Sequence, residues 1–234
     1  MSTVNRGIIT NGLVLCLDAS NVKSASSGSV IWNNIGRTNI SGSLTNGAIY
    51  SSASLGCISF DGLDDYISFS PTTIFNITSK ITVEAFINPS VNNQNAVIVS
   101  KWHTGGNTNN SYCLWAGQDA ATNKFSFSIE QSNLTIKPLN STVTYNANQW
   151  YHLVGVADGS FVRLYINGVS SDTPLAYDGT ININTSDFRI SVLSSLFSTY
   201  YFKGKIANVR IYDRGLSETE VLQNYNVTKT RFGL

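Results

Sequence analysis

The stretch LVGVADGSFVRLYINGV, from Leu153 to Val169, decides the fold class of this chain. It reads as two short strands rich in aliphatic and aromatic residues, interrupted by the dipeptides Asp158-Gly159 and Asn167-Gly168. Both dipeptides tolerate the positive φ angles that two-residue hairpin turns require. The stretch therefore predicts consecutive antiparallel strands joined by tight turns.

Similar strand patterns, separated by Gly, Asn, Asp and Ser, recur on both sides of this stretch. They lie at residues 13–17, 58–60, 67–69, 81–89, 96–102, 111–115, 125–130, 188–193 and 205–213. Short strands at such regular spacing are typical of a two-sheet β-sandwich. The 234 residues contain no internal repeat and no linker, so we expect one all-β domain over residues 13–216.

One helix is expected, near the C-terminus. In LSETEVLQNYN, Ser217 and Glu220 form a capping box, in which each side chain satisfies a free amide at the helix start. This predicts a helix over residues 217–226 that packs on the domain. The segments 1–12 and 227–234 carry no core pattern of their own, and we expect them to make contacts between subunits.

The composition excludes several function classes. Charged residues make up 12% of the chain and the net charge is +1, with Lys and Arg scattered, so a nucleic-acid partner is not expected. No apolar run is long enough to span a membrane, and residues 13–17 are too short for the core of a signal peptide. We therefore expect neither membrane insertion nor export by a signal peptide.

The three cysteines, Cys16, Cys57 and Cys113, match no zinc-binding spacing and lie in apolar stretches. We expect buried free thiols. A bridge between Cys16 and Cys57 stays open if their strands pair.

Five segments in order carry a family resemblance. They are GLVLCLDAS (12–20), ISFDGLDDYISF (58–69), ITVEAFINP (81–89), NQWYHLVGVADGSFVRLYINGV (148–169) and FKGKIANVRIYDRGLSETEVLQNYN (202–226). Together they resemble the laminin-G-like branch of the concanavalin A-like lectin/glucanase superfamily. The resemblance implies a jelly roll of two antiparallel sheets. The ending, with its capped helix and its Arg-Phe-Gly-Leu terminus, resembles versions seen in bacteriophage sequences.

An acidic cluster at Asp61, Asp64 and Asp65 lies between two predicted strands. Ca²⁺ prefers six to eight oxygen ligands, and this turn supplies several. We expect Asp18 to lie nearby, because its strand is predicted to run beside residues 58–60. The alternative is that these aspartates only accept hydrogen bonds from the backbone amides of a turn.

The resemblance bears on this metal site in two opposite ways. Laminin-G-like and pentraxin relatives often hold calcium at a rim of the sandwich, which favours Ca²⁺ as a cofactor. In many of them the last long strand reads Ile-Asp-Glu, where this chain has Ile206-Ala207-Asn208. Ala207 removes one carboxylate from that pattern.

Catalysis is not expected. Glycoside hydrolysis needs two carboxyl groups facing one groove, and the laminarinase-type relatives carry theirs in a Glu-x-Asp-x-x-Glu motif that this chain lacks. Glu84 and Glu130 stand alone in their strands, although a meeting of the two across a sheet stays open. His152 lies in a predicted strand, where we expect a packed side chain. The sequence has no Gly-x-Ser-x-Gly nucleophile elbow.

Ligand binding by aromatic side chains remains. Trp102, His103, Tyr112 and Trp115 flank a loop rich in Gly and Asn, and Tyr200 lies in another predicted loop. Sugars stack their C–H faces on such rings, while polar neighbours bond their hydroxyls. The alternative is that these rings fill the core of the sandwich.

Three functions follow from these observations. The first is a non-catalytic module displayed on a phage particle as a structural, decoration or adhesion protein. Its partners would be other virion proteins or further copies of itself, together with a cell-surface glycan. The lack of a signal peptide favours this virion localisation, since particles leave by lysis. The alternatives are a free lectin-like carbohydrate-binding module and, third, a glucanase-type hydrolase.

Overall fold

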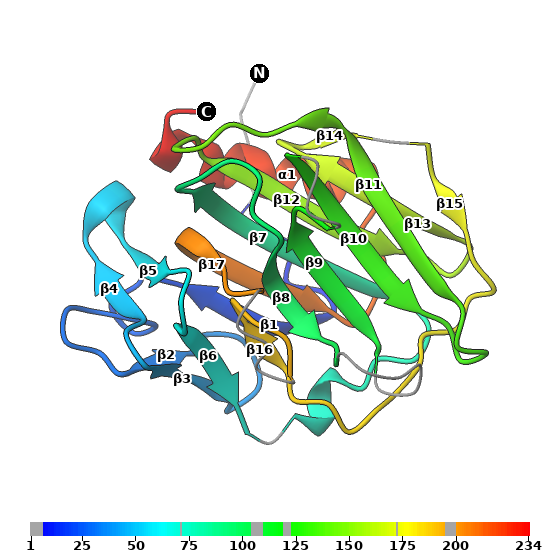
Figure 1. Ribbon diagram of the computed structural model, residues 1–234, viewed down its shortest axis with the longest axis horizontal. Helices are drawn as coiled ribbons and strands as arrows, with labels where there is room; N and C mark the ends of the chain where they lie inside the picture. Colours follow the sequence, from blue (N-terminus) through cyan, green and yellow to red (C-terminus); the bar gives the residue numbers. More distant parts are fainter. Residues whose placement is uncertain (1–6, 71, 104–109, 119–122, 172, 195–199) are drawn as a thin grey trace.

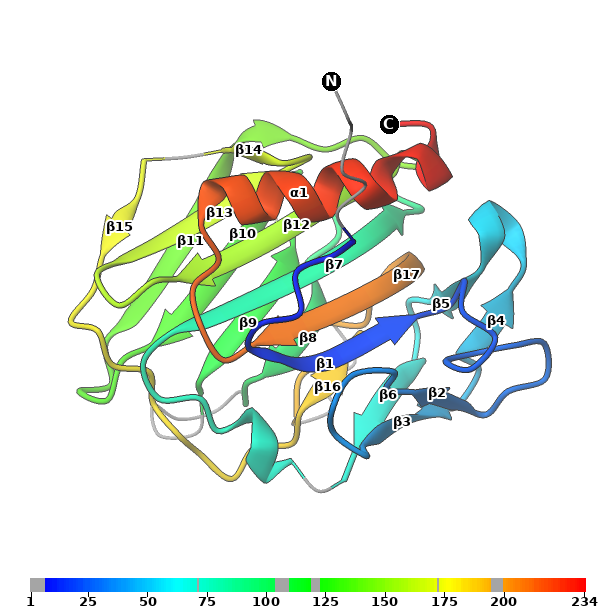
Figure 2. The same cartoon turned by 180° about the vertical axis from the view of Figure 1, so that it is seen from behind.

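The computed structural model describes residues 7–70, 72–103, 110–118, 123–171, 173–194 and 200–234. Two antiparallel sheets stack face to face, and one α-helix crosses the outer side of one sheet near the C-terminus (Figures 1 and 2). The expected all-β jelly-roll sandwich with a short C-terminal helix is confirmed.

The first sheet, sheet A, carries the strands of the opening stretch. Its order is β14-β13-β12-β7-β17-β5-β4, with β1 also pairing with β17 and β15 with β13. Its strands are β1 (Leu13–Asp18), β4 (Ile49–Ser51), β5 (Cys57–Asp61), β7 (Ile81–Pro89), β12 (Tyr151–Ala157), β13 (Phe161–Ile166), β14 (Val169–Ser170), β15 (Leu175–Ala176) and β17 (Lys203–Tyr212).

The second sheet, sheet B, faces it across the core. Its order is β11-β10-β9-β8-β16-β6-β3-β2. Its strands are β2 (Ile31–Asn33), β3 (Ser41–Thr45), β6 (Tyr66–Phe69), β8 (Ala96–Lys101), β9 (Tyr112–Ala116), β10 (Lys124–Glu130), β11 (Ile136–Thr144) and β16 (Arg189–Ile190). Two short 3₁₀ turns, η1 (Ala53–Leu55) and η2 (Thr73–Phe75), connect strands.

Both hairpins of the opening stretch form, one with the predicted turn residues Asn167-Gly168 and the other with Gly159-Ser160, not Asp158-Gly159, at its centre. Strands β12 and β13 pair in antiparallel register, with Leu153 opposite Ile166. Asn167 and Gly168 both have positive φ angles, of 52° and 78°, and join β13 to β14. At the other turn Gly159 has a φ of 100°, and the amide of Asp158 donates to the carbonyl of Phe161.

Alternation along the strands sends one set of side chains into the core between the sheets. In β10, Phe125, Phe127 and Ile129 are buried in this core, as the sequence predicted. Gly155 of β12 lies directly against Phe127, since a Cβ atom on it would be 2.2 Å from the ring. The missing side chain lets sheets A and B approach closely at this point.

Helix α1 (Glu218–Thr228) begins at the predicted cap. The Ser217 hydroxyl accepts from the Glu220 amide, and the Glu220 carboxylate accepts from the Ser217 amide. Val221 and Leu216 then pack against Val154, Val156 and Tyr212 on the outer side of sheet A. The helix ends at Thr228, two residues beyond the expected end.

The C-terminal tail differs from the expectation. Residues 229–232 form a 3₁₀ turn, η3 (Lys229–Phe232), that folds back onto its own domain. The Phe232 ring stacks on Phe86 at 4.8 Å and lies 4.4 Å from Trp150. The Phe232 ring therefore packs on its own domain, which argues against a contact of this ring with a second subunit.

The three cysteines are buried and free, as expected. Cys16 and Cys57 form no bridge, because β1 and β5 each pair with β17 and not with one another. None of the described helices has the length and apolar character needed to cross a lipid bilayer.

Candidate functional site

Two of the four predicted ligand-binding residues meet on the outer side of sheet B. Trp102 follows β8, and Trp115 lies in β9. With Val97, Cys113, Leu193 and Tyr200 they form a hydrophobic cluster separate from the main core. The ring of Tyr200 contacts that of Trp115 edge to face, with centroids 5.8 Å apart.

Strand alternation explains why these two rings share a side. In β9, Tyr112 and Leu114 point into the core, so Cys113 and Trp115 point outward. Tyr112 therefore lies outside the site: it is fully buried, and its hydroxyl donates to the Phe75 carbonyl. His103 lies at the end of the same loop, where its backbone amide donates to Asn110.

A pocket of about 220 Å³ opens beside these rings, and we call it the aromatic pocket. It is lined by Asn95, Trp102, Trp115, Gln118, Ile136, Leu193 and Tyr200. Trp102 and Trp115 are only 6% and 4% exposed, so each side chain is largely buried and contributes only a small exposed part to the pocket.

Two buried polar atoms of this lining have no hydrogen-bond partner among the described residues. They are the indole Nε1 of Trp115, a donor, and the amide Oδ1 of Asn95, an acceptor. A buried donor or acceptor left unpaired costs about 1–3 kcal/mol. Both atoms have less than 1 Å² of accessible surface, so neither is open to the pocket. Asn95 and Gln118 were not predicted, because lone polar residues beside a strand carry no sequence signal.

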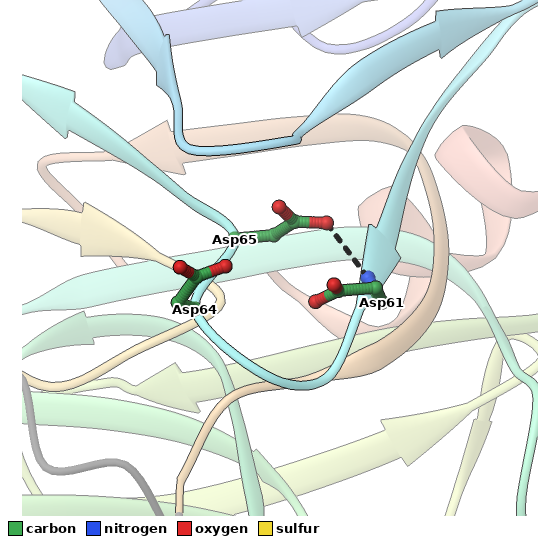
Figure 3. A group of neighbouring side chains, drawn as sticks. All are labelled: Asp61, Asp64 and Asp65. Atoms are coloured by element: carbon green, nitrogen blue, oxygen red, sulfur yellow. Dashed lines mark hydrogen bonds between the residues drawn. The ribbon is translucent and has the colours of Figure 1, made fainter.

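The acidic turn is the second candidate. Figure 3 shows Asp61, Asp64 and Asp65 gathered at the turn between β5 and β6. One carboxylate oxygen of each lies within 4.8 Å of the others. Asp65 is almost fully buried, which raises the pKa of its carboxyl group. Its Oδ1 has no partner within the described part of the chain.

The same aspartates also hold the turn together. The Oδ2 atom of Asp65 accepts from the Asp61 amide at 2.8 Å, and Oδ1 of Asp61 accepts from the Leu63 amide at 2.8 Å. Gly62 has a φ of 81°, which allows the sharp bend. The hydrogen bonds therefore support the turn interpretation, while the gathered oxygens remain compatible with a cation.

Asp18 does not join this cluster, so that expectation was wrong. Strands β1 and β5 lie one after the other along the same edge of β17, with Asp18 opposite Asn208 and Asp61 opposite Lys203. Five residues of strand separate the two positions by roughly 16 Å. Asp18 instead accepts from Arg231 of η3 at 2.7 Å.

Ala207, where some relatives carry an aspartate, is an apolar contact here. It packs with Cys57 and Phe86 in a small cluster that Trp150, Tyr225 and Phe232 cover.

Glu84 is fully buried on the outer side of sheet A, beneath α1. Its Oε1 atom bonds the Arg210 guanidinium and lies 3.1 Å from Nε2 of His152, while Oε2 accepts from Asn224 at 2.7 Å. Burial alone would raise the pKa of Glu84, but Arg210 first, then His152 and Asn224, outweigh it and lower the pKa to about 2. A carboxylate that stays ionised cannot act as a general acid near neutral pH.

Glu130 lies on the opposite side of the molecule. It ends β10 on the outer side of sheet B, where it accepts from Asn110 at 2.7 Å and Asn182 at 2.9 Å. The core separates it from Glu84, so the two carboxylates cannot flank one glycosidic bond. The sequence had left such a pair open, and the structure contradicts it.

Solved structures with a similar fold include two toxin binding domains and a sialidase. The binding domain of Paraclostridial Mosquitocidal Protein 1 matches with a TM-score of 0.71 and 17% identity, over 92% of this chain and 52% of that chain. The binding domain of botulinum neurotoxin serotype G gives 0.67 and 14%, over 93% and 51%. Trypanosoma rangeli sialidase gives 0.63 and 15%, over 94% and 33%.

The chain thus spans about half of each toxin binding domain and a third of the sialidase, and at these identities the likeness shows the fold alone. None of the curated proteins matches the sequence significantly. A family model described as concanavalin A-like lectin/glucanases superfamily matches residues 60–222, more than half of the chain. With its sandwich of two antiparallel sheets, the chain belongs to this superfamily, in the laminin G-like branch.

Proposed function

We propose that this protein is a non-catalytic binding module that holds a glycan in the aromatic pocket. The observation that carries the proposal is the composition of that pocket, where aromatic walls from Trp102, Trp115 and Tyr200 stand beside the amide side chains of Asn95 and Gln118. Sugars present apolar C–H faces together with hydroxyl groups that both donate and accept. Toxin binding domains with the same fold are consistent with a binding role.

The separation of Glu84 and Glu130 supports a binding module over a hydrolase. Each carboxylate is satisfied by its own structural partners, on a different sheet. Glycosidases keep their two carboxyl groups about 5–10 Å apart across one groove. We expect no sugar release from any glycan that the protein binds.

A glycan array followed by titration calorimetry tests the binding proposal. Trp115→Ala and Tyr200→Ala should each weaken binding at least tenfold, because each removes a wall of the pocket. Trp150→Ala is the matched control, since Trp150 contacts Phe232 on the other side of the molecule. A blank array, or equal losses in all three variants, would contradict the proposal.

We also propose a Ca²⁺ ion at the acidic turn, on the observation that oxygens of Asp61, Asp64 and Asp65 lie within 4.8 Å of one another. Calorimetry with Ca²⁺ should give saturable binding to the wild type and none to Asp64→Asn. Asp64 is the residue to change, because its neighbours Asp61 and Asp65 hold the turn. The exposed Asp213→Asn is the control, and an unchanged isotherm for Asp64→Asn would exclude the site.

Display on a phage particle is proposed on the resemblance of residues 217–234 to phage sequences, with other virion proteins or further copies of this chain as partners. Mass spectrometry of purified particles should detect the chain in constant ratio to the main capsid protein. Its presence in the lysate but absence from washed particles would count against display and favour a free carbohydrate-binding module.

A further inference from the structure

We infer that Lys101 and Glu130 are positioning residues for the aromatic pocket, because together they fix the backbone on both sides of Trp102. This inference rests on the proposed function, since Trp102 is one wall of the same pocket. The contacts that carry it form a closed ring of hydrogen bonds and short backbone segments. The ring starts at Glu130, passes through Trp102 and returns through residues 182–186.

The first half of the ring runs from Glu130 to the residue that follows Trp102. The Oε2 atom of Glu130 accepts from the side-chain amide of Asn110 at 2.7 Å. The Oδ1 atom of Asn110 in turn accepts from the backbone amide of His103 at 3.1 Å. Because His103 directly follows Trp102, these two hydrogen bonds fix the backbone on one side of the pocket wall.

The second half of the ring reaches the other side of this tryptophan. The Oε1 atom of Glu130 accepts from the side chain of Asn182 at 2.9 Å, and the backbone amide of Asn182 donates to the Glu130 carbonyl at 2.7 Å. Further along this segment, the Lys101 ammonium group donates to the carbonyls of Asn184 and Ser186, at 3.2 and 2.7 Å. Since Lys101 directly precedes the tryptophan, both of its chain neighbours are held.

The backbone of Trp102 is also tied to a second residue of the pocket lining. The backbone amide of Ser194 donates to the Trp102 carbonyl at 2.9 Å, and Leu193, which lines the pocket, directly precedes Ser194. The Ser100 hydroxyl group donates to the Val192 carbonyl at 2.8 Å, which adds a second link between these two segments. A shift of the backbone at Trp102 is therefore expected to move Leu193 as well.

Both positioning residues are charged side chains that are buried without a partner of opposite charge. Lys101 is 1% and Glu130 0% exposed, and neither forms an ion pair within the described part of the chain. Burial lowers the pKa of Lys101 to about 8 and raises the pKa of Glu130. Such burial costs stability. It also gives strong support to a backbone segment, because hydrogen bonds to a charged group are about twice as strong as neutral ones.

The test exchanges a donor and an acceptor within the ring. In Glu130→Gln the NH₂ group of the new side chain faces the NH₂ group of Asn110 or of Asn182, so one hydrogen bond is lost. In the double variant Glu130→Gln/Asn110→Asp the donor and the acceptor are exchanged and the bond returns, while residue 110 still accepts from His103. Recovery in the double variant therefore reports the hydrogen bond itself.

The first readout is the set of indole ¹H–¹⁵N NMR signals of the full chain, recorded without any sugar. We expect Glu130→Gln to shift the Trp102 signal and the double variant to return it towards the wild-type position. Lys101→Met should also shift it, and this variant keeps the test open if Glu130→Gln fails to fold. The Trp150 signal should not move, because Trp150 lies outside the pocket. An unmoved Trp102 signal in either folded single variant would overturn the inference.

The second readout is the affinity for the methyl glycosides of glucose, galactose and mannose, measured by titration calorimetry. For each of these that binds the wild type, Glu130→Gln and Lys101→Met should weaken binding about fivefold to tenfold, because the wall loses part of its support. Glu84→Gln is the matched control. It changes a buried carboxylate beneath α1 on sheet A, so it should lower the stability and leave the affinity unchanged.

The outcomes distinguish this inference from the proposed function. Unchanged affinities in Glu130→Gln and Lys101→Met, or an equal loss in Glu84→Gln, would overturn the positioning role while a glycan function stands. No binding of the three glycosides, together with a blank glycan array, would remove the proposed function. The Trp102 signal would then still decide whether Lys101 and Glu130 position that ring.

Discussion

Glu84 shows how a sandwich can bury a carboxylate for stability and not for catalysis. Its partners come from three elements: Arg210 from β17, His152 from β12 and Asn224 from α1. The His152 ring also stacks between Phe86 and Tyr225. The sequence predicted a packed His152 and a polar contact for Glu84, because both interrupt apolar strands, but it could not name the partners.

Glu84→Gln should lower the free energy of unfolding by about 3 kcal/mol, because it leaves the buried Arg210 guanidinium without its counter-charge. Urea denaturation measures the change. The exposed Glu218→Gln is the control and should stay within about 0.5 kcal/mol of the wild type. A neutral effect of Glu84→Gln would show that the ion pair contributes nothing net.

Acid should remove the stabilisation from Glu84 over a defined range of pH. Its pKa is about 2 in the folded chain, against an ordinary value of 4.5, so the folded state binds fewer protons. The contribution is therefore fully present above pH 4.5 and is lost as the pH falls from 4.5 towards 2. Unfolding curves at several pH values should show a shallower acid loss in Glu84→Gln than in the wild type; parallel losses would contradict this.

At the scale of elements, local signals predicted most strands and the helix, and missed segments stabilised mainly by their neighbours. The capping box of Ser217 and Glu220 can be recognised from four consecutive residues of the sequence. The edge strand β11 was missed because Pro138 and several Ser and Thr residues interrupt its apolar pattern. Edge strands tolerate proline, since one side of their backbone needs no ladder partner.

We expect η3 to stabilise the domain by covering part of the outer side of sheet A. Phe232→Ala should lower the free energy of unfolding by about 1–2 kcal/mol, because the half-buried ring leaves Phe86 and Trp150 uncovered. Chemical denaturation of this variant and of the control Leu234→Ala, which alters an exposed side chain, measures the difference. Equal stabilities would mean that the tail does not stabilise the domain.

At the scale of the whole molecule, the two sheets form one core whose spacing depends on few positions. Gly155 is the third residue of the stretch that predicts the fold, yet the need for a glycine there comes from tertiary packing, because it faces Phe127 of the opposite sheet. The sequence shows that residue 155 of β12 is a glycine. Only the stacking of the two sheets explains why a larger residue would not fit there.

Gly155→Ala should lower the free energy of unfolding by about 1–3 kcal/mol, because the new methyl group would overlap the Phe127 ring and push the sheets apart. Thermal unfolding followed by near-ultraviolet circular dichroism measures this. Gly7→Ala is the control, since nothing lies within 4 Å of a Cβ atom there. A variant as stable as the wild type would show that the packing adjusts freely.

The sequence by itself determined the strands with clear alternation, the two glycine-containing hairpin turns, the capped helix and the family. These features depend on contacts within a few residues, where side-chain periodicity and backbone preference act directly. Only the tertiary structure decided that Asp18 pairs with Arg231, that Glu84 and Glu130 lie on opposite outer sides, and which residues line the aromatic pocket. Alternation fixes the side of a sheet on which a residue lies, whereas its neighbours there depend on strand pairings between distant parts of the chain.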